Sequence, residues 1–517
     1  MKQFFFNFLI VILINFSYAQ TYISWETTYG GTASHTLNDV IQTIDGGYIL
    51  TGNNGSSDGD ATEHFGGYGD LWVVKIDPIG NIEWQRSYGG TEYDQGREII
   101  QISDGGYIVL ARTSSSDGDV IGYQIGYQGN AITTDTWVIK LSSLGEIEWQ
   151  KCLGGSLNDY PVDIIQTNDG GYAFISHTNS DDGDVSNSID NYHFWLVKLN
   201  AEGTIMWDQS YGTNYTNPIN GVNGQSYPAS LLQTIDGGFI ISGETQSNYV
   251  ELIGWNTDAL IIKTDSSGNV EWRNSYGGSS IDRATDIIQT TDGGYIFIGD
   301  TRSTDGSFTD NNGGSDIWVV KLDSLGEIEW MELYGSEGYN DESQNIIETS
   351  TGYIFAASVS EPGGDVIGFN GGDGDAWIVE INNSGEIQSQ NCIGSSEKER
   401  VLSKLSRTFD GGYIFGGVKS LDITTPRKWW VVKLSSALAV EDITIQKNIN
   451  IYPNPTVDKI FIVSNSPQKS TLFNLAGQKI LESNALELEI TDLPSGIYLL
   501  NSQSTQNQIS TFKIIKK

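Results

Sequence analysis

Residues 287–301 read IIQTTDGGYIFIGDT, two short apolar runs on either side of Asp-Gly-Gly. Apolar and β-branched runs separated by turn residues predict a β-hairpin. Glycine readily adopts positive φ angles, and Asp bonds to nearby backbone in tight turns. We therefore expect this Asp-Gly-Gly to serve turn geometry, with positive φ at both glycines, and Tyr295 to begin the second strand.

The hairpin occurs seven times along the chain. The aromatic residue after the turn recurs at intervals of 56 to 67 residues, as Tyr48, Tyr107, Tyr172, Phe239, Tyr295, Tyr353 and Tyr413. Each unit also contains a run like Trp-Val-Val-Lys-Leu, with Leu260 replacing one Trp, and most contain Ile-Glu-Trp twelve residues later. Seven units of four short strands predict an all-β fold, a seven-bladed β-propeller with four-stranded blades. Ser350-Thr351-Gly352 replaces one Asp-Gly-Gly, so the turn tolerates the loss of Asp.

The last unit lacks its fourth strand, and the missing run lies at the other end of the chain. Residues 23–31 read ISWETTYGG, and Trp25 precedes Tyr48 by 23 residues, the interval from Trp84 to Tyr107. The N-terminal strand is therefore expected to complete the seventh blade. Closing the ring in this way removes open strand edges.

The first 19 residues have the pattern of a secretory signal peptide. A short basic start is followed by an apolar run and by Ser17-Tyr18-Ala19, which predicts cleavage before Gln20. The apolar run is too short to span a membrane, and no later segment is long enough. The formal net charge of −37 argues against nucleic acid as a partner. We expect residues 20–436 to form the propeller, followed by a linker at 437–448.

Residues 449–517 differ in composition from the rest, since they carry a net charge of +1 and residues 1–448 carry −38. Alternating apolar and polar residues predict a small Ig-like β-sandwich. The motifs YPNP (452–455), LFNLAGQKI (472–480) and LPSGIYLL (493–500) and the basic ending resemble the type A C-terminal sorting domain of the type IX secretion system of Bacteroidetes-type bacteria. The matching residues are Tyr452, Pro453, Asn454, Pro455, Gly477, Gly496 and Tyr498.

This resemblance implies export through the periplasm and translocation across the outer membrane by the type IX machinery. In that family the domain is removed, and the cargo is either released or attached to lipopolysaccharide. The repeats themselves resemble secreted Bacteroidetes proteins with DGGY and WVVKLD repeats, a similarity that brings no activity with it.

Acidic, glycine-rich loops follow the second strand of most units. Carboxylates and glycines suit calcium, although no helix-flanked calcium loop is present and Asp and Gly also favour ordinary turns. Calcium is thus an expected cofactor if the loops bind metal at all. The candidate ligands are Asp58, Asp60, Asp117, Asp119, Asp182, Asp184, Asp373 and Asp375.

Other chemical signals are sparse. Trp255, in the expected loop ELIGWNTDAL, is a candidate for stacking on a glycan, although packing of the loop is the more common role of such a residue. The four histidines, His35, His64, His177 and His193, have no metal-type spacing, and no nucleophile or phosphate-loop motif occurs. No catalytic residue is assigned. Cys152 and Cys392 lie in non-neighbouring units and are expected to be unpaired.

The sequence therefore favours a secreted or surface-attached propeller that binds a glycan or a protein. Two alternatives stay open. One is an enzyme acting on polysaccharide through carboxylates at the mouth of the ring. The other is a structural or adhesion protein with calcium-stiffened loops. Unlike acidic and aromatic side chains gathered at one channel mouth would favour the enzyme, whereas uniform loops would favour binding or structure.

Overall fold

The computed structural model describes most of the 517-residue chain. The described residues are 23–124, 126–128, 131–189, 192–213, 224–250, 254–305, 308, 311, 314–338, 340–372, 374–421, 425–435, 449–452, 459–464, 468–474, 479–483, 485, 487–491, 493–494, 496–504 and 509–516. Among them there is no helix, and the chain divides into two compact units, Met1–Leu438 and Ala439–Lys517. The predicted signal peptide lies outside the described residues.

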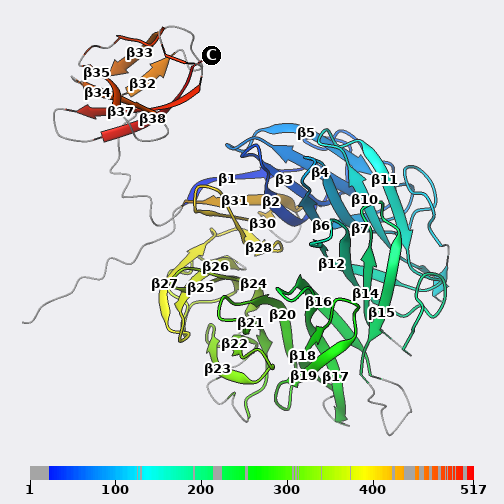
Figure 1. The fold of residues 1–517 in the computed structure, drawn as a ribbon. Coiled ribbons are helices and arrows are strands. Elements are labelled where there is room, and N and C mark those ends of the chain that lie inside the picture. The colour runs from blue at the N-terminus through cyan, green and yellow to red at the C-terminus, as the bar shows by residue number, and fades with distance from the viewer. Residues whose placement is uncertain are drawn as a thin grey trace, which may run out of the picture. The chain divides into compact units, whose positions relative to one another are not determined.

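The first unit is a ring of seven antiparallel sheets, which confirms the predicted all-β, seven-bladed propeller (Figure 1). From the innermost to the outermost strand, blades one to six are β2 (Thr36–Gln42), β3 (Tyr48–Asn54), β4 (Asp70–Ile76), β5 (Ile82–Tyr88); β6 (Asp94–Gln101), β7 (Tyr107–Thr113), β10 (Asp135–Leu141), β11 (Ile147–Leu153); β12 (Asp159–Gln166), β13 (Tyr172–Thr178), β14 (His193–Leu199), β15 (Ile205–Tyr211); β16 (Ser226–Gln233), β17 (Phe239–Val250), β18 (Gly254–Thr264), β19 (Val270–Tyr276); β20 (Asp282–Gln289), β21 (Tyr295–Thr301), β22 (Asp316–Leu322), β23 (Ile328–Tyr334); and β24 (Glu342–Glu348), β25 (Gly352–Val359), β26 (Asp375–Asn382), β27 (Ile387–Ile393). A two-residue-strand hairpin, β8 (Tyr127–Gln128) with β9 (Ala131–Ile132), lies in a loop of blade two.

The seventh blade joins the two ends of the repeat array. Its inner strand is split into β28 (Lys398–Val401) and β29 (Ser406–Arg407), and both pair with β30 (Tyr413–Ser420), followed by β31 (Lys428–Leu434). The outermost strand is β1 (Ile23–Tyr29), which pairs antiparallel with β31. The predicted closure by the N-terminal strand is confirmed.

The periodic aromatic residues hold neighbouring blades together. In six of the seven blades the outer strand carries a Trp that packs against the aromatic residue after the turn of the next blade, as in Trp84–Tyr107 (6.1 Å) and Trp272–Tyr295 (5.8 Å) between ring centroids. Trp25 makes the same contact with Tyr48 at 5.7 Å, which joins blade seven to blade one. The constant 23-residue interval is thus the chain distance between two rings that pack across a blade boundary.

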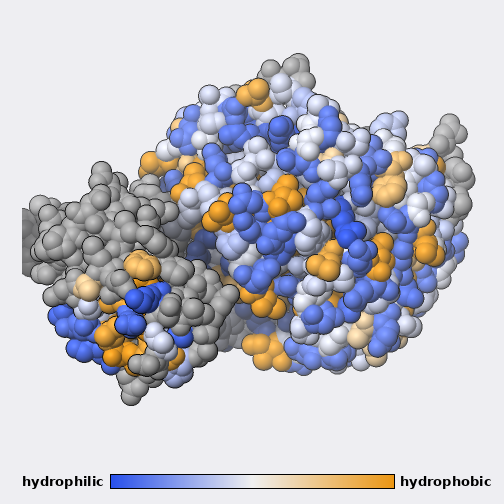
Figure 2. Space-filling view, turned by 90° about the horizontal axis from the view of Figure 1, so that it is seen from above, coloured by the Kyte–Doolittle hydropathy of each residue, from blue (hydrophilic) through white to orange (hydrophobic). Residues whose placement is uncertain are grey.

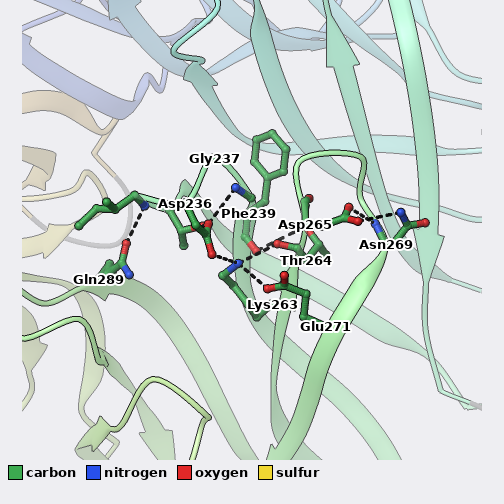
Figure 3. A network of polar contacts seen from close by, with 12 residues as sticks. Asp236, Gly237, Phe239, Lys263, Thr264, Asp265, Asn269, Glu271 and Gln289 are labelled. Carbon is green, nitrogen blue, oxygen red and sulfur yellow. Dashed lines mark hydrogen bonds and ion pairs between the residues drawn. The ribbon is translucent and has the colours of Figure 1, made fainter.

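The Asp-Gly-Gly turns also carry an ion pair. In blade four, Asp236 Oδ1 accepts from Thr234 Oγ1 and the Gly238 N–H, and Asp236 Oδ2 pairs with Lys263 Nζ at 2.8 Å (Figure 3). Lys263 is the buried lysine of the Trp-Val-Val-Lys-Leu run, and it also contacts Glu271 at 2.8 Å. The six lysine–aspartate pairs of this type are Lys75–Asp45, Lys140–Asp104, Lys198–Asp169, Lys263–Asp236, Lys321–Asp292 and Lys433–Asp410.

The expectation of positive φ at both glycines is wrong for the second. Gly46 and Gly293 have φ of 89° and 88°, but Gly47 and Gly294 do not adopt positive φ. The second glycine is needed for close approach, because a Cβ on Gly47 would lie 2.3 Å from the Ile76 carbonyl oxygen. The two glycines are therefore required for different steric reasons, the first for its positive φ and the second for the close approach of the neighbouring strand.

Blade six departs from the other six in two places at once. Its turn is one residue shorter, closing through a Thr349 N–H bond to the Gly352 carbonyl at 2.7 Å. The lysine position is Glu380, whose carboxylate accepts from Ser389 Oγ. The Asp and the Lys are lost together, as expected if each is there to pair with the other.

The second unit is a small two-sheet β-structure. Its strands are β32 (Ile449–Tyr452), β33 (Lys459–Ser464) and β36 (Glu487–Glu489) in one sheet, and β35 (Lys479–Ser483), β34 (Gln468–Asn474), β37 (Gly496–Ser504) and β38 (Ile509–Lys516) in the other. Its core includes Ile460, Leu472, Leu500 and Ile514.

Candidate functional site

Seven structurally equivalent residues form a ring around the central channel. They lie nine positions before the aromatic residue of each turn, or eight in the shortened blade six. In blade order they are Asp39, Glu98, Asp163, Ser230, Asp286, Asn345 and Lys404. In blades one to six the ring residue follows a β-bulge in the inner strand, and in blade seven it lies between β28 and β29. Bulges re-aim side chains in this way.

Most ring residues link one blade to the next. Asp39 Oδ2 accepts from the Ile99 N–H at 3.0 Å, and Glu98 Oε2 accepts from the Ile164 N–H at 2.9 Å. Equivalent bonds join Asp163 to Leu231, Asp286 to Ile346 and Asn345 to Leu405. These side chains therefore have a structural role, because each accepts a hydrogen bond from a backbone N–H that would otherwise be buried without a partner.

Lys404 is the single basic member of the ring. The Lys404 Nζ lies 3.2 Å from Glu98 Oε1 and 2.8 Å from Asp163 Oδ2. Lys404 belongs to blade seven, whereas its two partners belong to blades two and three. Burial and then repulsion from Asp163 raise the pKa of Glu98 well above its usual range. Burial opposes ionisation of Asp163 too, but Lys404 and the hydrogen bonds that Asp163 accepts hold its pKa below the usual value. The two shifts therefore favour the proton on Glu98 and the negative charge on Asp163.

The ring separates two cavities along the channel. The lower cavity, about 590 Å³, lies on the side of the Asp-Gly-Gly turns. Its walls repeat the same two apolar residues and a Gln in nearly every blade, as in Ile164-Ile165-Gln166 and Leu231-Leu232-Gln233. Several of these Gln side chains accept from a turn N–H of the preceding blade, for example Gln289 from Ile235 at 2.9 Å (Figure 3). The lower cavity is therefore lined by repeated scaffold.

The upper cavity, about 380 Å³, lies on the side of the acidic loops and is lined differently. At the position directly before the ring residue, the seven blades carry seven different residues: Asn38, Arg97, Val162, Ala229, Thr285, Gln344 and Ser403. Six of these seven line the cavity, together with His177, Tyr227 and Lys404. Side chains that converge here are unlike, although the strands that present them are repeats.

An aromatic cluster borders the upper cavity on blades three and four. The His177 ring lies 4.9 Å from Tyr160, 5.6 Å from Tyr192 and 5.2 Å from Tyr227, measured between centroids. Burial, and then the charge of Arg97, lower the pKa of His177 to about 4. His177 is therefore neutral at neutral pH and presents an uncharged polar edge beside the Tyr227 ring.

The predicted calcium ligands are mostly tied to backbone. Asp58 accepts from the Thr32 N–H at 2.8 Å, and Asp117 and Asp182 make the same bond with Thr91 and Ser156. Asp60 and Asp184 accept from the N–H groups of Gly30 and Gly154. Asp119 donates its N–H to Gly89. Asp375 lies buried at the start of β26, and Asp373 lies outside the described residues.

These loop carboxylates are not brought together. In the part of the chain that the structure describes, no three His, Cys, Asp or Glu side chains are grouped so as to hold a metal ion. Calcium stays a prediction. Hydrogen bonding within the protein explains the acidic residues of these loops instead. The first Asp of each Asp-Gly-Asp sequence accepts from a backbone N–H in the connection between two blades.

The other predicted residues are placed as follows. Trp255 lies in β18, opposite Tyr249 near the tip of the long β17–β18 hairpin, and not in a loop. Cys152 and Cys392 are free and buried at equivalent positions of β11 and β27. Tyr498 is buried in the core of the second unit, and its hydroxyl donates to the Pro494 carbonyl at 2.8 Å. Tyr452 and Gly496 lie in β32 and β37. Pro453, Asn454, Pro455 and Gly477 lie outside the described residues.

Sequence reasoning missed the upper cavity. The similarity between the units was expected to argue against a catalytic site. The relevant signal was instead a single position in each unit, the one directly before the ring residue, which is occupied by a different residue type in all seven units. Aligning the seven units on the turn and asking which column varies most would have found Arg97, Thr285 and Gln344. Their convergence could not be read from the sequence, because it depends on the bulge that turns each inner strand toward the axis.

Residues 450–517 match the secretion system C-terminal sorting domain family. This match supports the predicted sorting tail and marks the chain for export to the cell surface or extracellular space, with the type IX secretion machinery as its partner. No helix among the described residues has the length and apolar character required to cross a membrane.

Two curated relatives match the repeats at low identity. The chain is 19% identical over 401 residues to regulatory protein FlaEY of Caulobacter vibrioides and 22% identical over 368 residues to Colossin-A of Dictyostelium discoideum. The matches cover 69% and 66% of this chain but only 40% and 3% of those proteins. Among solved structures, a fungal alcohol oxidase of the AA5 family with copper has a TM-score of 0.41 at 9% identity, covering 96% of this chain and 99% of that one. Likeness at this level carries no functional argument.

Proposed function

We propose that this exported propeller is a binding module whose ligand, a glycan or a protein segment, enters the upper cavity. One observation supports the proposal most directly: the column of residues before the ring differs in all seven blades, whereas the columns after it repeat. The position directly before the ring residue lines the upper cavity in six blades and differs in every blade, whereas the position directly after it is Val, Ile or Leu in every blade. Such divergence within a repeated strand is expected when the cavity that it lines binds a ligand. A volume of about 380 Å³ lies within the range of about 300–1,000 Å³ typical of small-ligand sites.

The test is a binding screen with the full chain lacking only residues 1–19. Glycan arrays and a library of surface proteins are screened with the wild type and with Tyr227→Ala and Gln344→Ala. Loss of binding in both variants is the expected result. A ligand whose binding is unaffected by either substitution would place the functional site elsewhere. Binding to proteins alone would identify the protein partner as the biological ligand.

A polysaccharide-acting enzyme is the second candidate. Glu98 and Asp163 support it, because two adjacent carboxyl groups whose pKa values are driven apart resemble an acid and a base. Both side chains, however, also bond to the next blade, and Asp163 is almost fully buried. Hydrolysis of common polysaccharides that is abolished by Glu98→Gln at unchanged stability would favour the enzyme; no turnover in either protein would remove it.

Calcium-stiffened loops belong to the third candidate, a structural or adhesion protein. Bound calcium would raise the melting temperature, and a chelator would lower it. An unchanged midpoint would leave the loops held by their own hydrogen bonds alone. Attachment to lipopolysaccharide, as opposed to release, is tested by cell fractionation of the native host.

The exterior fits an exported, hydrated protein. In the face shown in Figure 2, hydrophobic side chains are scattered among hydrophilic ones. The high negative charge favours solubility.

A further inference from the structure

Blade two carries two neighbouring arginines with no carboxylate partner among the described residues, and one of them lines the upper cavity. Arg97 lines the cavity, and neither hydrogen bond nor ion pair joins its guanidinium to another residue in the described ranges. Arg112, on the adjacent strand β7, lies over the Tyr93 ring with its guanidinium carbon 4.6 Å from the centroid, and its buried Nε has no hydrogen-bond partner. The Arg97 side chain reaches solvent, but desolvation by the channel wall, and then the charge of Arg112, lower the pKa of Arg97.

Two other arginines at this end of the channel do have carboxylate partners. Arg283 Nε pairs with Glu244 at 2.6 Å, and Arg400 Nε pairs with Glu342 at 3.0 Å. Glu98, the nearest acidic residue in sequence to Arg97, is already used by Lys404 and the Ile164 N–H. In a chain with 65 acidic and 28 basic residues, an unpaired arginine pair is not explained by a shortage of carboxylates.

The surroundings of Arg97 offer more than charge. His177 and Tyr227 line the same cavity and form part of the aromatic cluster, and Asn38, Thr285 and Gln344 supply neutral hydrogen-bonding groups. An aromatic face, neutral donors and acceptors, and a planar guanidinium are the groups that recognise a sugar ring bearing a carboxylate. A neutral glycan would leave the arginines unpaired, and a phosphate or sulfate would have no use for the aromatic wall.

We propose that the upper cavity binds a hexuronate, the carboxylate-bearing sugar of acidic polysaccharides, with Arg97 paired to the carboxylate and Tyr227 and His177 against the sugar ring. This inference rests on the proposed binding function and names its ligand class. Arg112 acts from behind, since its charge keeps the site positive within a strongly acidic protein. The carboxylates of the ring below disfavour a second anion inside the cavity, so we expect only one carboxylate of an acidic oligosaccharide to enter it while the others stay in solvent.

The test measures binding of three probes to the full chain lacking residues 1–19: a galacturonate trisaccharide, its methyl ester and a neutral galactose trisaccharide, with glucuronate and mannuronate oligomers as further arms. The acid is expected to bind at least about tenfold more tightly than its ester, as one charge-assisted hydrogen-bonded pair implies. Arg97→Gln is expected to remove this difference, and Arg97→Lys to restore only part of it, because lysine lacks the planar fork. Arg407→Gln, at the opposite end of the channel, is the matched control and is expected to leave binding unchanged.

The outcomes separate this inference from the proposed function. Equal affinity for acid and ester, or no effect of Arg97→Gln, overturns the hexuronate inference and leaves a binding role intact. If no hexuronate binds, yet another ligand does and is lost in Tyr227→Ala, the cavity is a binding site for a different chemistry. Because the ester comparison uses the wild-type chain, a folding defect in a variant does not affect it. Arg97→Gln is itself expected to melt no lower than the wild type, since it removes an unpaired charge.

Discussion

The two cavities of the channel lie on one set of strands yet follow opposite rules. Below the ring, the two positions after the ring residue are Val, Ile or Leu in every blade except at Ser406, and a Gln follows them in five blades. Four of these Gln side chains accept from a turn N–H of the preceding blade. Above the ring, the corresponding column holds seven different residues, including the unpaired Arg97. The comparison shows that repetition here maintains the scaffold, and that divergence between repeats identifies the surface available for function.

Deleting β1 (Ile23–Tyr29) tests the scaffold most severely. Without it, β31 becomes an open edge, and the Trp25–Tyr48 contact between the last and first blades is lost. We expect the melting temperature to fall by about 10 °C or more, or the cooperative transition to disappear. Thermal denaturation followed by near-UV circular dichroism measures this. Ile23→Ala, a half-exposed position, serves as the control with little effect, and an unchanged transition in the deletion would contradict the closed ring.

Lys404→Met is expected to have the next largest effect. It leaves Asp163 and Glu98 side by side with no cation. Breaking a fully buried pair in this way costs about 3–5 kcal/mol, but the Lys404 side chain is 37% exposed, so we expect a loss of about 1–3 kcal/mol. The pKa of Asp163 is lowered in the folded protein, so its stabilisation is present above the unfolded pKa and is lost as the pH falls. The destabilisation should therefore be greatest near neutral pH and shrink below about pH 4.

Urea denaturation at pH 7 and pH 4 measures the effect of Lys404→Met. A loss of the same size at both values would show that Lys404 acts through packing and not through its charge. Ser403→Ala, next to it in the chain, is not a suitable control, because its hydroxyl accepts from the Gly416 N–H. Lys428→Met, at the exposed start of β31 in the same blade, keeps the ring intact and is expected to change stability little.

The two sides of the propeller should also respond oppositely to acid. On the loop side, burial raises the pKa of Asp135 to about 8, of Asp341 to about 7, and of Asp94 and Asp159 to about 6. The folded state then binds more protons than the unfolded state, so stability rises as the pH falls from 8 toward 5. On the turn side, the pKa of Asp169 and Asp292 is lowered to about 2, and that stability is lost as the pH falls from about 4 to 2.

A stability maximum near pH 5 is therefore expected, measured by thermal melts from pH 2 to pH 9. Asp135→Asn tests the loop side, because it should raise the melting temperature at pH 8 and leave it nearly unchanged at pH 5. A maximum at pH 7 or above, or no difference between variant and wild type at pH 8, would contradict the assignment.

Much of this scaffold was readable from the sequence. The seven turns, the four strands per unit and the closing strand follow from local pattern and spacing, because strands and tight turns depend on neighbouring residues. The ring and the upper cavity do not, since Glu98, Asp163 and Lys404 are separated by as many as 306 residues and meet only after six bulged inner strands and one split inner strand surround the channel. The Lys–Asp pairs were recoverable in principle, because Glu380 and the short turn replace both partners in the same unit.

The smallest expected effect concerns that paired replacement. Lys321 is buried between Asp292 at 2.9 Å and Glu329 at 3.0 Å, but both carboxylates are at least half exposed. Lys321→Met should therefore destabilise by only about 1 kcal/mol, because water can solvate the two carboxylates that remain. Glu380→Gln in blade six should change stability by less than about 0.5 kcal/mol, because no lysine is present to lose. The double-mutant cycle with Asp292→Asn separates the two contributions of Lys321. If Lys321→Met has no further effect in the Asp292→Asn background, the loss in the single variant is the energy of the Lys321–Asp292 pair. If the two losses add, Lys321 acts through the packing of its aliphatic stem and not through its charge.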